Sequence, residues 1–254
     1  MSNPPQPAAV QIIGLGGVPE IHSGDDLAAI ILAASAQTPL AAGDILVITH
    51  KVVSKAEGQL VELATIEPSA MARDWAAKWD KDARQVEVVL RESRRIVKMD
   101  RGVMICETHH GFVCANAGVD ASNVPGDDTV CLLPLNPDAS AQGIYDVLAA
   151  RLGFAVPIII SDSFGRPWRN GIVNIAIGVA GMAPLADYRG QYDTEGREMH
   201  VSVLAIADEI ASASELVTGK LDRRPITIVR GYAWDSHAGT AAELVMDPTR
   251  DLFR

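Results

Sequence analysis

The chain has 254 residues, a formal net charge of −10 and 48% hydrophobic residues. This length allows one large domain or two small ones, and the composition lacks the signature of a disordered chain. Non-specific nucleic-acid binding requires a basic surface, so the negative charge argues against it. The longest apolar stretch, residues 171–186, contains Asn174 and a proline and is too short to span a bilayer comfortably.

Two further features concern the cellular compartment. Residues 1–9 lack the charged and apolar regions of a secretory signal peptide, and we expect them to be disordered. The three cysteines show no CxxC spacing, so neither a disulfide framework nor a thiolate zinc site is expected. The sequence therefore predicts a soluble cytoplasmic protein.

The N-terminal elements begin with a predicted strand over residues 10–15, which ends in the glycine pair 16–17. Ser23, followed three residues later by Asp26, matches a capping box that opens a helix over residues 25–35. The pattern Gly-x-Gly-Gly that starts at residue 14 is not the full GxGxxG fingerprint, and no GxxxxGK[ST] loop occurs. We therefore expect neither a Rossmann nor a P-loop site.

The central region predicts a strand over residues 45–53 and helices over residues 68–79 and 83–97. A hairpin is expected between residues 102–109 and 111–116.

The remaining elements alternate between loops, helices and strands. They are a loop over residues 120–138, a helix over 140–153, a strand over 156–162, a small-residue stretch, an exposed loop over 187–199, a helix over 201–219 and a strand over 225–232. Hairpins mixed with helices between strands favour a mixed α/β (α+β) fold over a regular doubly wound sheet.

Two acidic turns carry the clearest chemical signal. Asp120 follows the run FVCANAGV, and Asp162 with Ser163 follows VPIIIS. Small residues in such turns let a ligand approach the backbone, and carboxylate and hydroxyl oxygens suit a hard cation. Arg166 and Arg169 lie nearby and could hold a carboxylate or phosphate through paired hydrogen bonds. Together the turns predict a shared site for a divalent cation and a phosphorylated ligand.

Simpler interpretations of these residues stay open. Asp120 and Asn123 are also typical of turns in which the side chain caps its own backbone. Lys51 and Lys55 follow a predicted strand, where they could face phosphate or only solvent. The pair at residues 109–110 is weak evidence for zinc because no third ligand accompanies the two histidines.

Seven sequence blocks resemble the coenzyme F420-0:L-glutamate ligase family. They are GGVPEIHSGDDL (16–27), GDILVITHKVVSKAEG (43–58), VCANAGVDASNV (113–124), ISDSFGRPWRNG (160–171), IAIGVAGM (175–182), D-x-x-G-R-E (193–198) and ADEIASASELVTGK (207–220). These blocks occur in the family's order and cover nearly the whole chain. The resemblance implies a family-specific mixed α/β fold that forms an intertwined homodimer. It also implies one ligase domain over residues 10–254, without the reductase-like domain of some bacterial relatives.

The reaction that the resemblance implies is GTP-dependent amide formation. GTP phosphorylates the terminal carboxylate of coenzyme F420-0, and the amine of L-glutamate then displaces phosphate from the acyl phosphate. Further glutamates can be added through γ-linkages. A divalent metal, Mn²⁺ or Mg²⁺, neutralises charge on the transferred phosphoryl group, and a monovalent cation such as K⁺ is compatible with the family.

The resemblance also assigns roles to individual residues. The metal-binding positions are Asp120, Asp162 and Ser163. Independently of the resemblance, the two acidic turns and the nearby arginine lead us to expect that Asp120, Asp162 and Arg166 are catalytic. The GTP-contacting positions are Val18, Pro19, Glu20, Ile21, His50, Lys51, Lys55 and Asn123.

One position departs from the family pattern. Archaeal-type relatives place a metal-binding Glu after the glycine that ends the long helix, whereas here Lys220 follows Gly219. We expect Lys220 to face the GTP phosphates in place of a second metal. The alternative is a solvent-facing lysine at a helix end.

Three other functions stay open on the sequence. The chain could be a ligase of this family that acts on another carboxylate acceptor. A metal-dependent phosphohydrolase could use the same acids with water as the acceptor. A regulatory module would bind GTP without turnover.

Overall fold

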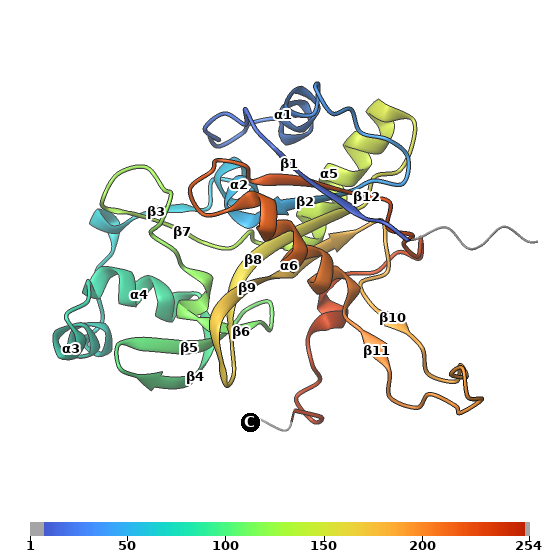
Figure 1. Ribbon diagram of the computed structural model, residues 1–254. Coiled ribbons are helices and arrows are strands. Elements are labelled where there is room, and N and C mark those ends of the chain that lie inside the picture. The colour runs from blue at the N-terminus through green and yellow to red at the C-terminus, as the bar shows by residue number, and fades with distance from the viewer. Residues whose placement is uncertain (1–7, 252–254) are drawn as a thin grey trace, which may run out of the picture.

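A computed structural model describes residues 8–251. Residues 1–7, which belong to the segment 1–9 that we expect to be disordered, lie outside this range. A five-stranded sheet in the order β1-β12-β2-β8-β9 forms the centre of the larger part of the molecule (Figure 1). Its strands are β1 (Gln11–Leu15), β12 (Ile226–Arg230), β2 (Ile45–Thr49), β8 (Ile158–Arg166) and β9 (Arg169–Ala180). Strands β2 and β8 are parallel, and the other neighbours are antiparallel. Together with the helices, this sheet confirms the predicted mixed α/β class.

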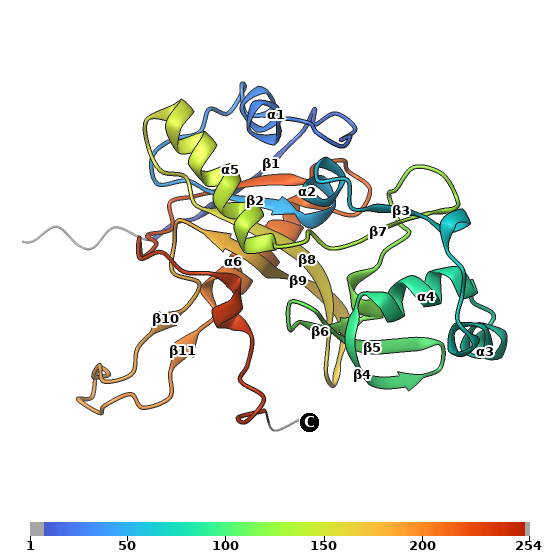
Figure 2. The same ribbon diagram turned by 180° about the vertical axis from the view of Figure 1, so that it is seen from behind.

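Helices cover both faces of this sheet. Helix α6 (Ile206–Thr218) lies on the face turned to the viewer in Figure 1, and α5 (Pro137–Leu152) lies on the opposite face, seen in Figure 2. Helices α1 (Leu27–Ala34) and α2 (His50–Ala56) belong to the same apolar layer as α5. None of the helices within residues 8–251 is long and apolar enough to cross a membrane.

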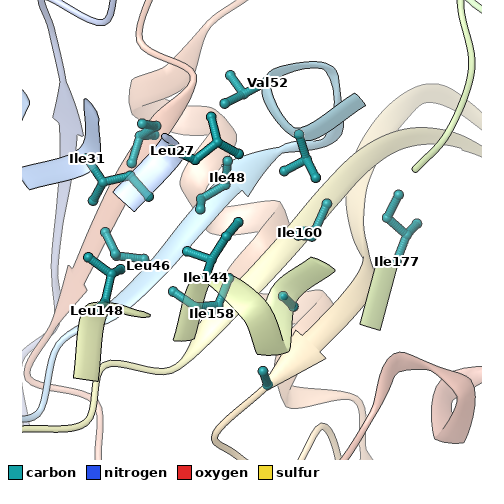
Figure 3. Packing of buried hydrophobic residues seen from close by; sticks show 14 of the residues in the cluster. Leu27, Ile31, Leu46, Ile48, Val52, Ile144, Leu148, Ile158, Ile160 and Ile177 are labelled. Atoms are coloured by element: carbon teal, nitrogen blue, oxygen red, sulfur yellow. The ribbon is translucent and has the colours of Figure 1, made fainter. Parts of the chain in front are cut away.

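The strand sequences account for the two apolar layers. Side chains alternate between the faces of a strand, so an apolar run can fill both layers. Leu46 and Ile48 of β2 pack with α1 and α5, as Figure 3 shows, whereas Ile45 and Val47 pack with α6. The same alternation in β8 places Ile158 on the α5 side and the next isoleucine on the α6 side.

Residues 60–131 form a smaller part beside the sheet, with its own apolar cluster (Figure 1). Its elements are β3 (Leu60–Glu62), α3 (Ala70–Trp79), α4 (Ala83–Arg91), β4 (Ser93–Asp100), β5 (Val103–Thr108), β6 (Val113–Ala115) and β7 (Thr129–Cys131). The pair β10 (Ala186–Asp187) and β11 (Val203–Leu204) projects away from the sheet, and short 3-10 helices span Leu63–Thr65, Asn116–Gly118 and Ala241–Leu244. The predicted hairpin over 102–116 is confirmed as β5–β6, with β4 as a third strand.

The predicted strand over residues 45–53 is wrong beyond Thr49, because helix α2 begins at His50. Two adjacent valines favour a strand by their β-branching, and a short apolar run does not distinguish a strand from a buried helix. Val52 and Val53 are buried in the layer that contains α1. Tertiary packing therefore outweighs local preference here.

The predicted helix over residues 83–97 also ends early. Helix α4 stops at Arg91, and the hydroxyl of Ser93 donates to the carbonyl of Val89 at 2.5 Å, which satisfies one of the free carbonyls at the helix end. The chain then enters β4 and pairs with β5.

Strand β9 is absent from the sequence prediction, which treats this region as a small-residue stretch. Its small residues permit close packing, since a Cβ atom on Gly178 would lie 2.4 Å from the carbonyl oxygen of Pro137 at the start of α5. The predicted helix over 201–219 begins only at Ile206, because Val203–Leu204 forms β11.

The predicted capping box is also incorrect at its first residue. The N-cap of α1 is Asp26, whose carboxylate accepts a hydrogen bond from the amide of Ala29 at 3.0 Å. Ser23 lies before the helix.

Candidate active site

A cleft with a cavity volume of about 1060 Å³ lies at the end of β2, beside the part of β8 that continues past the pair Thr49–Ser161. Asp162 and Ser163 were predicted in a turn, but they lie within β8 and pair with β9. The carboxyl ends of neighbouring parallel strands are a common place for ligands to bind. All the predicted site residues except Arg166 and Arg169 line it: Val18, Pro19, Glu20, Ile21, His50, Lys51, Lys55, Asp120, Asn123, Asp162, Ser163 and Lys220. The fold thus brings together residues from distant parts of the chain.

Asp120 is held by a lysine from α2. The ammonium of Lys51 lies 2.6 Å from the Asp120 carboxylate and also donates to the carbonyl and hydroxyl of Ser122. Burial alone would raise the pKa of Asp120, but hydrogen bonds from Lys51 and Ser122 outweigh it and lower this pKa below its usual value. Asp120 is therefore a stable anion in the cleft.

Asp162 lies against the buried imidazole of His50, with 3.3 Å between the carboxylate oxygen Oδ1 and Nε2. The backbone amide of Ser163 donates to the same oxygen at 2.7 Å. The other ring nitrogen of His50 faces the hydroxyl of Ser54 at 3.4 Å. These contacts restrict the orientation of the Asp162 carboxylate at the cleft wall.

The loop between β1 and α1 supplies the third side of the cleft. Its Glu20 pairs with Lys55, a largely buried lysine from the last turn of α2. Ile21 is buried in the core, which anchors the loop beside the lysine.

Lys220 points into the cleft from the loop after α6. Its ammonium donates to the hydroxyl of Ser163 at 2.7 Å and lies 3.1 Å from the carboxylate of Glu215. Although the side chain is 55% exposed, these contacts hold it against the cleft wall. This placement differs from that of a lysine that only extends into solvent.

Two cysteines lie behind the acidic turns. Burial, with a smaller contribution from the charge of Asp162, raises the pKa of Cys114 to about 12. Burial also raises the pKa of Cys131 to about 11, and the backbone of this residue pairs with that of Asp120. Both thiols therefore stay protonated at neutral pH, a form that is a poor nucleophile and metal ligand.

Asn174 on β9 and Glu215 on α6 are among the polar residues of the cleft wall that sequence reasoning missed. An asparagine within the apolar run GIVNIAIG is a signal of a buried polar contact, whereas Glu215 has no sequence signal that separates it from surface residues.

Conversely, the structure does not bring Arg166 to the cleft. Its guanidinium donates to the carbonyl of Asn170 within the β8–β9 hairpin.

The donor set suits a hard cation. Asp120, Asp162 and Ser163 offer carboxylate and hydroxyl oxygens to one cleft, which are the ligands that Mg²⁺ and Mn²⁺ prefer. Between residues 8 and 251, no group of three or more His, Cys, Asp or Glu side chains is arranged to hold a metal. A cation here would therefore complete its coordination with water or ligand oxygens.

The sequence is similar to those of known ligases over most of its length. The model of the F420-0:Gamma-glutamyl ligase family matches residues 17–231. A relative named Coenzyme F420:L-glutamate ligase from Methanothermobacter thermautotrophicus is 43% identical over 96% of this chain and 99% of its own. Relatives with the same name are 45% identical in Methanopyrus kandleri, over 92% and 94% of the two chains, and 42% identical in Methanocaldococcus jannaschii, over 96% and 97%. Since the match covers most of the chain and includes both acidic turns, the chain belongs to the F420-0:gamma-glutamyl ligase family.

Proposed function

We propose that this protein is a GTP-dependent ligase that joins L-glutamate to coenzyme F420-0 through an acyl phosphate. The observation that carries the proposal is the convergence of both acidic turns and three lysines on one cleft, in a chain that belongs to the ligase family. The relatives named Coenzyme F420:L-glutamate ligase support the choice of acceptor and amino acid.

The lysines account for phosphate binding. Lys51, Lys55 and Lys220 face one cavity together with Arg223 and Arg224, although the whole chain carries a net charge of −10. Clustered cations at the end of a sheet are suited to a triphosphate, and the loop that contains Glu20 lines the same cavity.

The two chemical steps follow from this placement. A carboxylate oxygen of the acceptor attacks the γ-phosphorus of GTP, and GDP leaves. The nitrogen of L-glutamate then attacks the acyl carbon, loses a proton, and phosphate leaves with the bonding electrons. The cleft residues position the reactants and stabilise the negative charge that moves between oxygens.

A divalent cation fits the oxygen donors described above. Asp120, Asp162 and Ser163 would hold it, and it would neutralise charge on the transferred phosphoryl group. Asp162 is oriented for this by His50 and by the amide of Ser163.

We also infer that the protein acts as a homodimer in the cytoplasm. The long β8–β9 hairpin extends beyond the helix layers in Figure 1, and it exposes Trp168 and Ile172 at 82% and 56%. Exposed large apolar side chains on a projecting element favour a protein contact. Light scattering after gel filtration should give twice the monomer mass, and a monomer would overturn this inference.

Product analysis tests the proposed function. Purified protein should convert GTP, L-glutamate and coenzyme F420-0 into GDP, phosphate and a glutamylated product, detected by mass spectrometry, in the presence of Mn²⁺. Reactions that lack L-glutamate or the acceptor are the controls. Equal GTP consumption without acceptor and amine would instead favour a phosphohydrolase, and binding of GTP without turnover would favour a regulatory module. A different acylated product would identify another carboxylate acceptor.

A further inference from the structure

Four side chains form a closed ring of polar contacts in the cleft wall. The hydroxyl of Ser163 donates to Oδ1 of Asn174 at 2.7 Å, and Nδ2 of Asn174 donates to Glu215 at 2.9 Å. Lys220 completes the ring with its contacts of 3.1 Å to Glu215 and 2.7 Å to Ser163. The ring thus links β8, β9, α6 and the loop after α6.

The charged members determine the direction of every hydrogen bond in this ring. An ammonium only donates and a carboxylate only accepts. Glu215 therefore requires the NH₂ group of Asn174 to face it, which turns the amide oxygen of Asn174 toward Ser163. Because Lys220 also donates to Ser163, the single hydroxyl proton of Ser163 has to point to Asn174. One lone pair of the Ser163 oxygen accepts from Lys220, and the other is left to accept a cation that binds in the cleft.

From this ring we propose that Asn174 and Glu215 are positioning residues that keep the Ser163 hydroxyl as an acceptor for positive charge. The proposal rests on the proposed function, in which Ser163 contributes to a divalent cation site. Asn174 is 3% exposed, and burying an amide within an apolar strand is unfavourable unless its groups are hydrogen-bonded. The hydroxyl of Ser212 additionally donates to the backbone carbonyl of Asn174 at 2.6 Å.

The consequence of losing Glu215 is specific. Without a carboxylate acceptor, the Asn174 amide can turn and donate to Ser163 through its NH₂ group. The Ser163 proton then points into the cleft, where it opposes a cation. Glu215 thus acts on the metal through Asn174 and Ser163, and it does not need to touch the metal.

The test is Mn²⁺ affinity, measured on the full chain from the electron paramagnetic resonance signal of free Mn²⁺. Asn174→Leu and Glu215→Met should each weaken Mn²⁺ binding by about tenfold or more, the range typical of residues that orient metal ligands. In a Ser163→Ala background, the same two changes should have no further effect, because the group through which they act is gone. Glu209→Met on the exposed side of α6 is the matched control and should bind Mn²⁺ as the wild type does.

The outcomes separate this inference from the proposed function. Absence of Mn²⁺ binding by the wild type, or unchanged binding in Asp162→Asn, would overturn the metal site and the inference with it. Loss of binding in Asp162→Asn combined with wild-type affinity in Glu215→Met would overturn the inference alone. An equal loss in both the wild-type and Ser163→Ala backgrounds would show a merely structural role. If Asn174→Leu fails to unfold cooperatively in urea, the partly exposed Glu215 still provides the test.

Discussion

Arg230→Met should destabilise the protein strongly, because it would leave a buried carboxylate without its partner. Arg230, at the end of β12, donates to both oxygens of Asp44 at 2.7 Å. The Asp44 side chain is 1% exposed and accepts one other hydrogen bond, from the amide of Ala41 at 2.8 Å. Removal of the guanidinium therefore leaves a carboxylate that is largely shielded from water and has lost its ion-pair partner.

The magnitude follows from this burial. Loss of one partner of a buried ion pair costs about 3–5 kcal/mol. Arg230 itself is 34% exposed, so water that replaces it can solvate part of Asp44, and we expect a cost near the lower end, about 3 kcal/mol. With typical denaturant sensitivity, this loss lowers the urea midpoint by about 1 M.

Urea unfolding followed by circular dichroism measures the effect. The matched control is Arg189→Met, which removes an arginine that contacts both oxygens of Asp187 in a solvent-exposed pair. This control should leave the midpoint unchanged, because exposed pairs contribute little. The double variant Asp44→Asn, Arg230→Met should be more stable than Arg230→Met alone, since a neutral amide replaces the stranded charge. Equal effects of Arg230→Met and Arg189→Met would refute the argument from burial.

The cleft and its surroundings allow four more tests. Asp162→Asn should reduce ligation at least a hundredfold, or about 3 kcal/mol, with an unchanged fold by circular dichroism, whereas near wild-type turnover at limiting Mn²⁺ would refute its role as a metal ligand. Lys220→Ala should raise the KM for GTP or lower kcat, and unchanged kinetics across a metal titration would leave it a surface residue. The ionised Asp120, whose pKa is lowered, stabilises the fold above the pKa of the unfolded chain and loses this effect as pH falls through the folded pKa. Lys51→Met should therefore reduce the loss of unfolding free energy at acid pH, as measured by urea unfolding. An unchanged loss would count against a stabilising Lys51–Asp120 pair. The three buried thiols should react with Ellman's reagent only after unfolding in guanidinium, and rapid reaction of the native protein would contradict their raised pKa values.

The sequence predicts the strands and turns that build the cleft because their signals are local. The apolar runs of β2 and β8 are followed by polar residues, and small residues precede Asp120. Continuous apolar runs and turn chemistry both appear within a few residues, so they can be recognised without the fold. The family resemblance then joins turns that lie about forty residues apart and that the structure brings to one cleft.

The features that the sequence does not reveal depend on contacts between distant elements. Helix α2 replaces a predicted strand because its valines pack in the same apolar cluster as α1. The small residues of β9 have a structural reason only in the fold, where Gly178 lets the strand approach the carbonyl of Pro137. Asn174 on β9 and Glu215 on α6 form a hydrogen bond although they are 41 positions apart in the sequence. Neither spacing nor composition predicts a hydrogen bond at that separation.

The cleft also explains how an acidic protein could bind a highly charged anion. Each cleft lysine already faces a carboxylate: Lys51 with Asp120, Lys55 with Glu20, and Lys220 with Glu215. In the proposed function a divalent cation takes up charge on Asp120, which weakens its hold on Lys51 and leaves that ammonium available to phosphate. Cation and nucleotide would therefore favour one another's binding. The carboxylates that make the chain acidic would at the same time keep the lysines in place until both ligands arrive.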